Sequence, residues 1–238
     1  DPARPPAPRG LRDRIHWPHA VAKATGGWCA SWVEGARYVA GFPPARALLA
    51  LVAALAWTIT PYSSLMPIYA RDVYRGGPEA LGMLLAAAGA GALLTTTYLA
   101  GRDSIRGLTR VIAYAGVASG LALAAFAYLR VLPLAMLLMA VVGGGVICAA
   151  ASTNTILQSI VEDRLRGRVA GFYTMAFLGI APLGNLAAGA LATAIGVKAT
   201  FLLNGALAVA AAAWFRRALK SFGPLLRSTY QRLGIVPD

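Results

Sequence analysis

The sequence has little of what most enzyme and metal sites require. Its 238 residues include two cysteines and two histidines, and no cysteine pair has the spacing of a metal or redox motif. His16 and His19 both lie in a polar N-terminal stretch, and the chain contains neither a phosphate-binding P-loop pattern nor the G-x-S-x-G pattern of serine hydrolases. We therefore expect a protein that is not an enzyme and that has no bound metal and no cofactor.

Charged residues are also scarce. They make up 13% of the chain, with nine acidic residues in all, whereas 58% of the residues are hydrophobic. Soluble domains have about a quarter of their residues charged. Together with a mean hydropathy of +0.62, this composition excludes an ordinary soluble domain and an intrinsically disordered chain. It indicates a membrane protein with several spans.

Long apolar runs are what the sequence has instead. A helix needs about 20 apolar residues to cross a hydrocarbon core of roughly 30 Å. These runs consist of Ala, Leu, Gly and Val without the alternation of a membrane β-barrel, so they favour helices. The sequence predicts an all-α integral membrane protein with six transmembrane helices. The expected spans are residues 46–70, 80–100, 108–129, 131–157, 169–195 and 199–215.

The regions that flank the expected bundle differ from it in composition. Residues 1–27 are rich in Pro, Arg and Gly and read as a basic cytoplasmic linker, and residues 28–45 as an amphipathic segment at the membrane surface. Residues 46–215 form the predicted six-helix bundle, and residues 216–238 a basic cytoplasmic tail. Pro61, Pro67, Pro133 and Pro182 lie in or at the ends of the expected spans, and those inside a span are expected to kink its helix, because proline removes a backbone hydrogen bond.

Basic residues are distributed unequally between the two sides of the predicted bundle. The side with both termini carries 18 Lys and Arg residues, and the opposite loops carry 4. Positive charge favours the cytoplasmic side, so we expect a multi-pass protein of the inner (plasma) membrane with both termini in the cytoplasm. Topology and contact with anionic lipid account for the net charge of +13. No nucleic-acid partner is therefore expected.

Polar and aromatic side chains recur inside the spans, although no charged residue lies near a plausible midplane. A proton relay would need such a residue, so any coupling carboxylate is expected outside these spans. The polar and aromatic side chains either line a cavity for a small-molecule substrate or hold helices together by hydrogen bonds. The candidate substrate-lining residues are Thr58, Tyr62, Thr95, Asn154, Gln158, Tyr173, Phe177 and Asn185.

Two short loops on the basic side, residues 101–110 and 162–168, combine glycine with closely spaced charges. Such loops can clasp the ends of neighbouring helices and release them when a gate moves, or they can be simple positive-inside turns. The candidate cytoplasmic gate residues are Gly101, Asp103, Arg106, Arg110, Asp163, Arg164, Arg166 and Arg168.

Several local sequences, in their order and spacing, resemble the C-terminal half of a major facilitator superfamily transporter. They are similar above all to the enterobactin-exporter-like branch, also called transmembrane secretion effectors, and the resemblance covers about residues 31–215. The segments that carry it are EGARY at 34–38, PYSSLMP at 61–67, IYARDV at 68–73, GGP at 76–78, LGMLLAAAGAGA at 81–92, LQ at 157–158, RGRV at 166–169, PLG at 182–184 and AG at 188–189.

This resemblance implies a twelve-helix transporter of two six-helix halves, with the missing N-terminal half or a pairing subunit as partner. Residues 1–45 would be its central cytoplasmic loop, and residues 101–110 would occupy the place of the family's G-x-x-x-D-R-x-G-R-[RK] loop, which they match in part. The implied function is proton-coupled efflux of a drug, siderophore or metabolite by alternating access. The alternatives are a complete six-span protein that pairs with another subunit, and a membrane assembly factor that transports nothing.

Overall fold

The computed structural model describes residues 28–102, 105, 107–161 and 163–232, and the regular structure in these residues is helical throughout. Within the described residues, six stretches are long and apolar enough to cross a membrane. The prediction of an all-α membrane protein with six spans is therefore confirmed. The six stretches are Pro43–Asp72, Gly77–Ala100, Leu108–Phe126, Leu132–Ile160, Leu165–Ile195 and Val197–Leu219.

Four of the spans are single helices, and two are interrupted. The single helices are α4 (Gly77–Ala100), α5 (Leu108–Phe126), α6 (Leu132–Ile160) and α9 (Val197–Arg232). The first span consists of α2 (Pro43–Thr58) and α3 (Tyr62–Asp72), and the fifth of α7 (Asp163–Thr174), the π-helical turn η1 (Met175–Gly179) and α8 (Ala181–Ile195). Helix α9 runs on into the region assigned to the basic tail, whereas the linker assigned to residues 1–27 lies outside the described residues.

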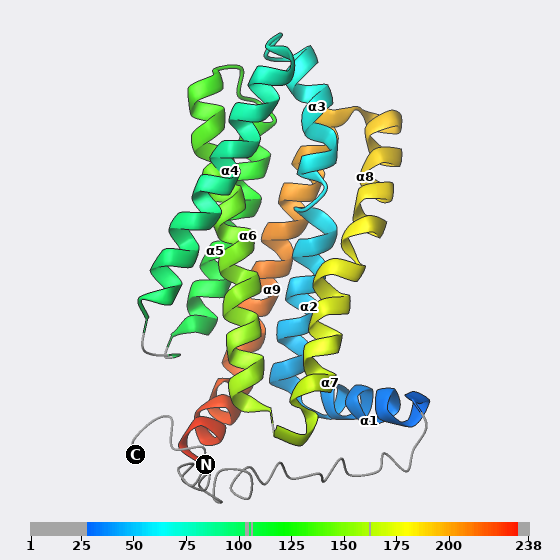
Figure 1. Ribbon diagram of the computed structural model, residues 1–238, viewed down its shortest axis with the longest axis vertical. Helices are drawn as coiled ribbons and strands as arrows, with labels where there is room; N and C mark the ends of the chain where they lie inside the picture. The colour runs from blue at the N-terminus through cyan, green and yellow to red at the C-terminus, as the bar shows by residue number, and fades with distance from the viewer. Residues whose placement is uncertain (1–27, 103–104, 106, 162, 233–238) are drawn as a thin grey trace, which may run out of the picture.

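Helix α1 (Trp28–Gly41) lies across one end of the bundle, roughly at right angles to the spans (Figure 1). The chain turns at Phe42, which is extended, and α2 starts on Pro43, where the missing backbone N–H of proline does no harm. Gly35 of α1 is buried against α7, so that a Cβ at this position would lie 2.8 Å from the Phe172 ring. The C-terminal ends of α4, α6 and α9 and the N-terminal ends of α5 and α7 lie at the same end of the bundle. We call it the α1 end.

The spans form a row in which each contacts the next: α4, α6, α5, α9, α2 and then α7–η1–α8. At the α4–α6 contact, a Cβ added at Gly91 would overlap the Ala140 carbonyl, and at the α5–α9 contact a Cβ added at Gly120 would lie 2.7 Å from the Gly205 carbonyl oxygen. Glycine allows the backbones to touch at both contacts. Because lipid tails are as apolar as the side chains, membrane helices associate mainly by such close packing at small residues.

The first and last spans of this row are poorly covered by the rest of the bundle. The buried share of the most apolar stretch is 22% in α4 and 11% in α7–η1–α8. In α2–α3 it is 56%. Added Cβ atoms at Gly82 and Gly89 of α4 and at Gly189 of α8 would meet nothing within 4 Å. These two spans therefore present bare apolar faces.

Two tyrosines fasten α3 at the end of the bundle opposite α1. The Tyr69 hydroxyl donates to the Ala127 carbonyl, and the Tyr74 hydroxyl donates to the Leu129 carbonyl at 2.9 Å. The Tyr69 ring packs against Phe126 and Phe201, with ring centroids 5.0 and 5.4 Å apart. Burial, and to a lesser degree the neighbouring Tyr69, raises the pKa of Tyr74 to about 12, so its hydroxyl stays protonated and can donate.

Candidate functional site

The first interrupted span breaks at Pro61, as expected from the sequence. Because proline has no backbone N–H, it cannot donate to the Trp57 carbonyl four residues earlier. The chain crosses the gap with turns in which the Tyr62 N–H donates to the Ile59 carbonyl at 3.0 Å. The hydroxyl of Thr58 donates to the Ala54 carbonyl at 2.7 Å. The break thus replaces regular helical hydrogen bonding by turns inside a membrane span.

The second interrupted span breaks beside the first. The π-helical turn η1 precedes Pro182, which cannot donate to the Leu178 carbonyl. Gly184, two residues later, packs on the end of α2, where an added Cβ would lie 2.6 Å from the Trp57 carbonyl oxygen. The helix α2 contacts both η1 and α8. The two breaks therefore form one region of irregular backbone, and π-helical turns often mark functional sites.

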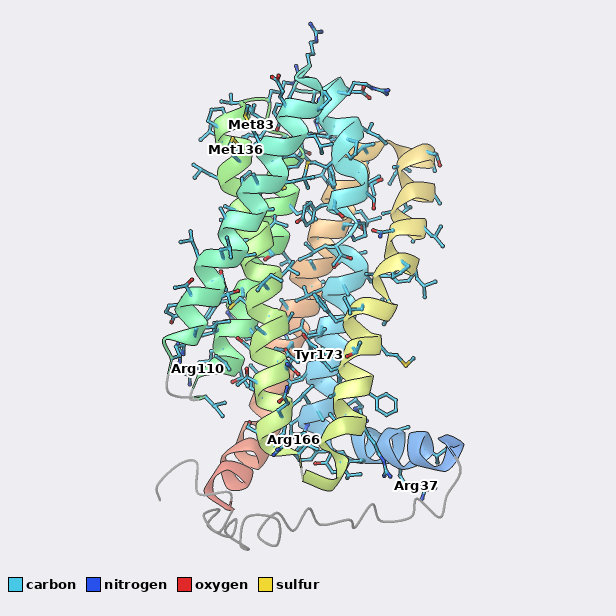
Figure 2. The ribbon with its side chains drawn as sticks, viewed as in Figure 1. Arg37, Met83, Arg110, Met136, Arg166 and Tyr173 are labelled. Carbon is cyan, nitrogen blue, oxygen red and sulfur yellow. The ribbon has the colours of Figure 1, made fainter. Side chains whose placement is uncertain are left out.

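Two pairs of the predicted lining residues lie on the elements that form the contact between α6 and α7, a contact that we call the α6–α7 seam. The Tyr173 hydroxyl donates to the Ala150 carbonyl on α6 at 3.0 Å. The rings of Tyr173 and Phe177 stack, with centroids 6.2 Å apart and planes at 22°. One and two turns along α6 from Ala150, Gln158 Nε2 donates to Asn154 Oδ1 at 3.0 Å. An aromatic pair therefore lies on the α7–η1 side of the contact, where Figure 2 labels Tyr173, and an amide pair lies on α6.

The π-helical turn affects where Asn185 lies relative to Tyr173. In an uninterrupted α-helix, twelve residues end about 120° away from the starting face. A π-helical turn contains one residue more than an α-helical turn, so the rotation about the helix axis between the two residues is smaller by about 100°. This leaves Asn185 within about 20° of the Tyr173 face. The Asn185 Oδ1 atom is buried and has no hydrogen-bond partner among the described residues. It is therefore an acceptor without a donor inside this half-bundle.

The remaining predicted lining residues lie elsewhere. Thr58 is buried in the bundle. Thr95 lies in the α4–α6 contact, 2.8 Å from where a Cβ at Gly144 would be. Tyr62 is half-buried at the start of α3. The structure thus pairs Tyr173 with Phe177 and Asn154 with Gln158, and it does not bring the full predicted set together.

The predicted gate residues can be followed only in part. Asp103 and Arg106 lie outside the described residues, and Asp163 and Arg164 belong to α7, although the structure does not describe their side chains. Gly101 ends α4, and Arg110 is exposed on the first turn of α5. Arg166 is exposed on α7 near the α6–α7 seam, and the Cβ of Arg168 approaches Gly35 of α1.

The sequence-based set of gate residues did not include Arg102, which the structure places at the α1 end. Its Nη1 donates to the Tyr98 hydroxyl at 2.9 Å, and its guanidinium lies 5.8 Å from the Tyr98 ring centroid. Arg102 also borders a cavity of about 100 Å³ between the α4–α5 turn and α6. The spacing of four residues between Tyr98 and Arg102 is the signal that could have pointed to this pair.

These features define a class of protein. Six packed spans, two of them interrupted side by side, and two bare end helices form a half-bundle of a major facilitator transporter. A family model described as "Transmembrane secretion effector" matches residues 23–226. The chain belongs to this family, which confirms the resemblance seen in its local sequences.

Curated relatives are multidrug efflux pumps. The chain is 34% identical over 171 residues to multidrug efflux pump Tap of Mycolicibacterium fortuitum, a match that covers 71% of this chain and 41% of the pump. It is 34% identical over 188 residues to the pumps of the same name from Mycobacterium tuberculosis H37Rv and Mycobacterium bovis BCG, covering 78% of this chain and 44% of each pump. The chain therefore spans less than half the length of the curated relatives that it matches.

Proposed function

We propose that this chain forms the C-terminal half of a secondary active exporter and works together with a second six-helix half. The exporter binds a drug, siderophore or metabolite between its halves and moves it out of the cell by alternating access. Membership of the family and the similarity to multidrug efflux pumps of more than twice the matched length support this function.

The observation that carries the proposal is the bare face on each end helix of the row. Helix α4 and the α7–η1–α8 span are long and apolar but poorly buried, whereas the α2–α3 span is half covered. Small residues at open positions such as Gly89 and Gly189 let another helix approach closely. A second half docked on these two faces would enclose a pathway between the halves.

The candidate site residues receive roles from this arrangement. Asn154, Gln158, Tyr173 and Phe177 line the pathway at the α6–α7 seam, and Asn185 lies further along the same face of the interrupted span. The arginines at the α1 end, among them Arg110, Arg166 and Arg168, hold the gate on that side. With 18 of the 22 basic residues on the side of this end, we assign the α1 end to the cytoplasm.

The coupling ion is a proton, and the other half supplies the titrating carboxylate. In this chain Asp72 and Glu79 lie at span ends, and the sequence has no Asp or Glu between residues 80 and 102, between residues 104 and 161 or between residues 164 and 237. The interior of these spans therefore has no acidic group that could carry a proton across the membrane.

The test compares the full-length natural protein, this chain alone, and this chain co-expressed with the other half. Each is expressed in bacteria without their own efflux pumps, and the uptake of cationic, neutral and anionic fluorescent drugs is measured in inverted membrane vesicles. We expect proton-driven uptake that a protonophore abolishes, present in the full-length protein, absent from the chain alone and restored by co-expression.

Two outcomes would overturn the proposal. A folded full-length protein without gradient-dependent uptake of any probe would favour a membrane assembly factor. Uptake by this chain alone, together with cross-linked dimers, would favour a half-size transporter that pairs with itself.

A further inference from the structure

We infer that the middle of the first span binds planar aromatic compounds that carry an N–H or O–H donor. The ring of such a compound stacks on Trp57, and its donor binds the hydroxyl oxygens of Thr60 and Ser63. This inference rests on the proposed export function and specifies the substrate class of its pathway. It is carried by the exposure of these side chains at the break between α2 and α3, a span in which the structure describes every side chain.

The row of spans curves into two layers, because α2 also contacts α6. The front layer consists of α4, α6, α2 and the α7–η1–α8 span, and the back layer consists of α5, which packs on α6, and α9, which packs on α2. The spans with bare faces, α4 and α7–η1–α8, lie at opposite sides of the bundle with α6 and α2 between them (Figure 1). A second half that docks on both bare faces therefore leaves the open face of α2 toward the pathway.

An exposed stripe runs along the first span. The exposed or half-buried residues that follow one another in steps of three or four are Ala50, Ala53, Trp57, Thr60, Ser64 and Pro67. The other faces of α2 pack against α9, α6 and α8, so the stripe lies on the face that remains. The sequence between residues 47 and 70 has no charged residue. The stripe therefore offers an aromatic ring and hydroxyl groups to a ligand, without a charge.

Trp57 stands halfway along the 30-residue span Pro43–Asp72. Its side chain is 40% exposed, whereas the leucines and the valine of α2 are buried. Tryptophan that faces lipid prefers the two membrane–water interfaces to the middle of the bilayer. Transporters bind their substrates near the midplane. An exposed tryptophan at this depth is therefore better explained by contact with a substrate than by contact with lipid.

The hydroxyl groups beside Trp57 act as hydrogen-bond acceptors. Thr60 follows Trp57 by three residues, a spacing that places both on one face. The Thr60 hydroxyl donates to the Ala56 carbonyl, and the Ser63 hydroxyl donates to the Thr60 carbonyl at 3.1 Å. A hydroxyl has one hydrogen and two acceptor lone pairs, so each oxygen can still accept a hydrogen bond. A ligand that stacks on Trp57 thus gains a hydrogen bond if it carries a donor.

The experiment compares two neutral probes of the same shape: carbazole, which has an N–H donor, and dibenzofuran, which has an ether oxygen in its place. Binding of the tritiated probes to the full-length natural protein in lipid nanodiscs is measured by scintillation proximity, with empty nanodiscs subtracted. We expect carbazole to bind about fivefold more tightly, the size of one neutral hydrogen bond. Thr60→Val combined with Ser63→Ala should remove this preference, and Thr60→Ser should keep it.

Trp57→Leu should weaken both probes about fivefold, because the stacking partner is lost, and Trp57→Phe, which keeps a ring, should weaken them less. Trp214→Leu is the matched control. Trp214 is 50% exposed on α9 of the back layer, so its loss should leave both affinities unchanged. Gel filtration checks that each variant is folded, and Trp57→Phe carries the comparison with Trp214→Phe if Trp57→Leu does not fold.

Three results would overturn the inference: equal affinity for the two probes, no saturable binding of either probe by the natural protein, or equal weakening by the substitutions at Trp57 and Trp214. Failure of the export function is a separate result. Probe binding would then keep its dependence on Trp57 while proteoliposomes transport nothing.

Discussion

Gly184 of α8 faces the carbonyl oxygen of Trp57 at the end of α2, so closely that a Cβ at position 184 would lie 2.6 Å from that oxygen. In a regular helix the Trp57 carbonyl would accept a hydrogen bond from the N–H of residue 61, and Pro61 has no N–H to donate. Two broken spans therefore meet at the point where one of them has lost a hydrogen bond. This contact joins the α2–α3 break to the π-helical turn that precedes α8.

Gly184→Ala should destabilise the protein. The added Cβ would press on backbone atoms of α2 that have no freedom to move aside, and overpacking of this kind costs about 1–3 kcal/mol. Thermal unfolding of the detergent-solubilised protein, followed by fluorescence-detected gel filtration, measures the change. Gly189→Ala on the same helix is the control, because a Cβ there would meet nothing within 4 Å. Equal melting temperatures for the two variants would contradict the close contact.

Pro61→Ala should stabilise the protein and slow transport. Alanine supplies an N–H that can donate to the Trp57 carbonyl and join α2 to α3. Because Pro61 stands at the N-cap of α3, the gain should be smaller than the roughly 3 kcal/mol that a proline costs inside a helix. The gain in stability comes with loss of the irregular backbone at the proposed pathway. Melting temperature and drug uptake in vesicles are measured together. Pro133→Ala is the control, since Pro133 is in the first turn of α6, where proline removes no helical bond; the same response in both variants would refute a special role for Pro61.

Tyr173→Phe should lower stability slightly and weaken substrate binding. The change removes the hydrogen bond to the Ala150 carbonyl but keeps the ring that stacks on Phe177. Hydrogen bonds between membrane helices contribute about 0.6 kcal/mol on average. We expect a KM for drug uptake raised a few-fold at an unchanged amount of protein. Tyr114→Phe, an exposed site on α5, should leave KM unchanged, and an unchanged KM in Tyr173→Phe as well would exclude Tyr173 from the pathway.

The protein should lose stability as the pH rises from 10 to 12, in a manner that depends on Tyr74. Its pKa is raised from 10.0 to about 12 by burial and, second, by Tyr69. A raised pKa means that folding favours the neutral phenol, so this contribution is complete below pH 10 and disappears as the pH passes 12. Melting temperatures at pH 9 and pH 11.5 should differ less in Tyr74→Phe than in the natural protein. A pH dependence that Tyr74→Phe leaves as steep as before would rule out this residue as its source.

The polar pairs show how far sequence reasoning could reach. Asn154 and Gln158 are four residues apart, a spacing that places two side chains on one helix face, and they are hydrogen-bonded. Tyr173 and Asn185 are three such steps apart. Their spacing does not reveal the π-helical turn between them, which changes the rotation about the helix axis by about 100°. Neither spacing nor composition could indicate that Tyr173 donates to Ala150, 23 residues away on the neighbouring helix.

The sequence by itself determined the class of this protein. Its six apolar runs must become helices, because lipid cannot satisfy backbone N–H and carbonyl groups. The missing N–H of Pro61 favours the break in the first span, although Pro67, which also lacks an N–H, lies inside the continuous helix α3. Tertiary structure decided which helices touch. Gly184 against Trp57, Gly120 against Gly205 and Tyr173 against Ala150 are contacts between distant parts of the chain. They depend on shape complementarity between packed helices, which no local pattern encodes.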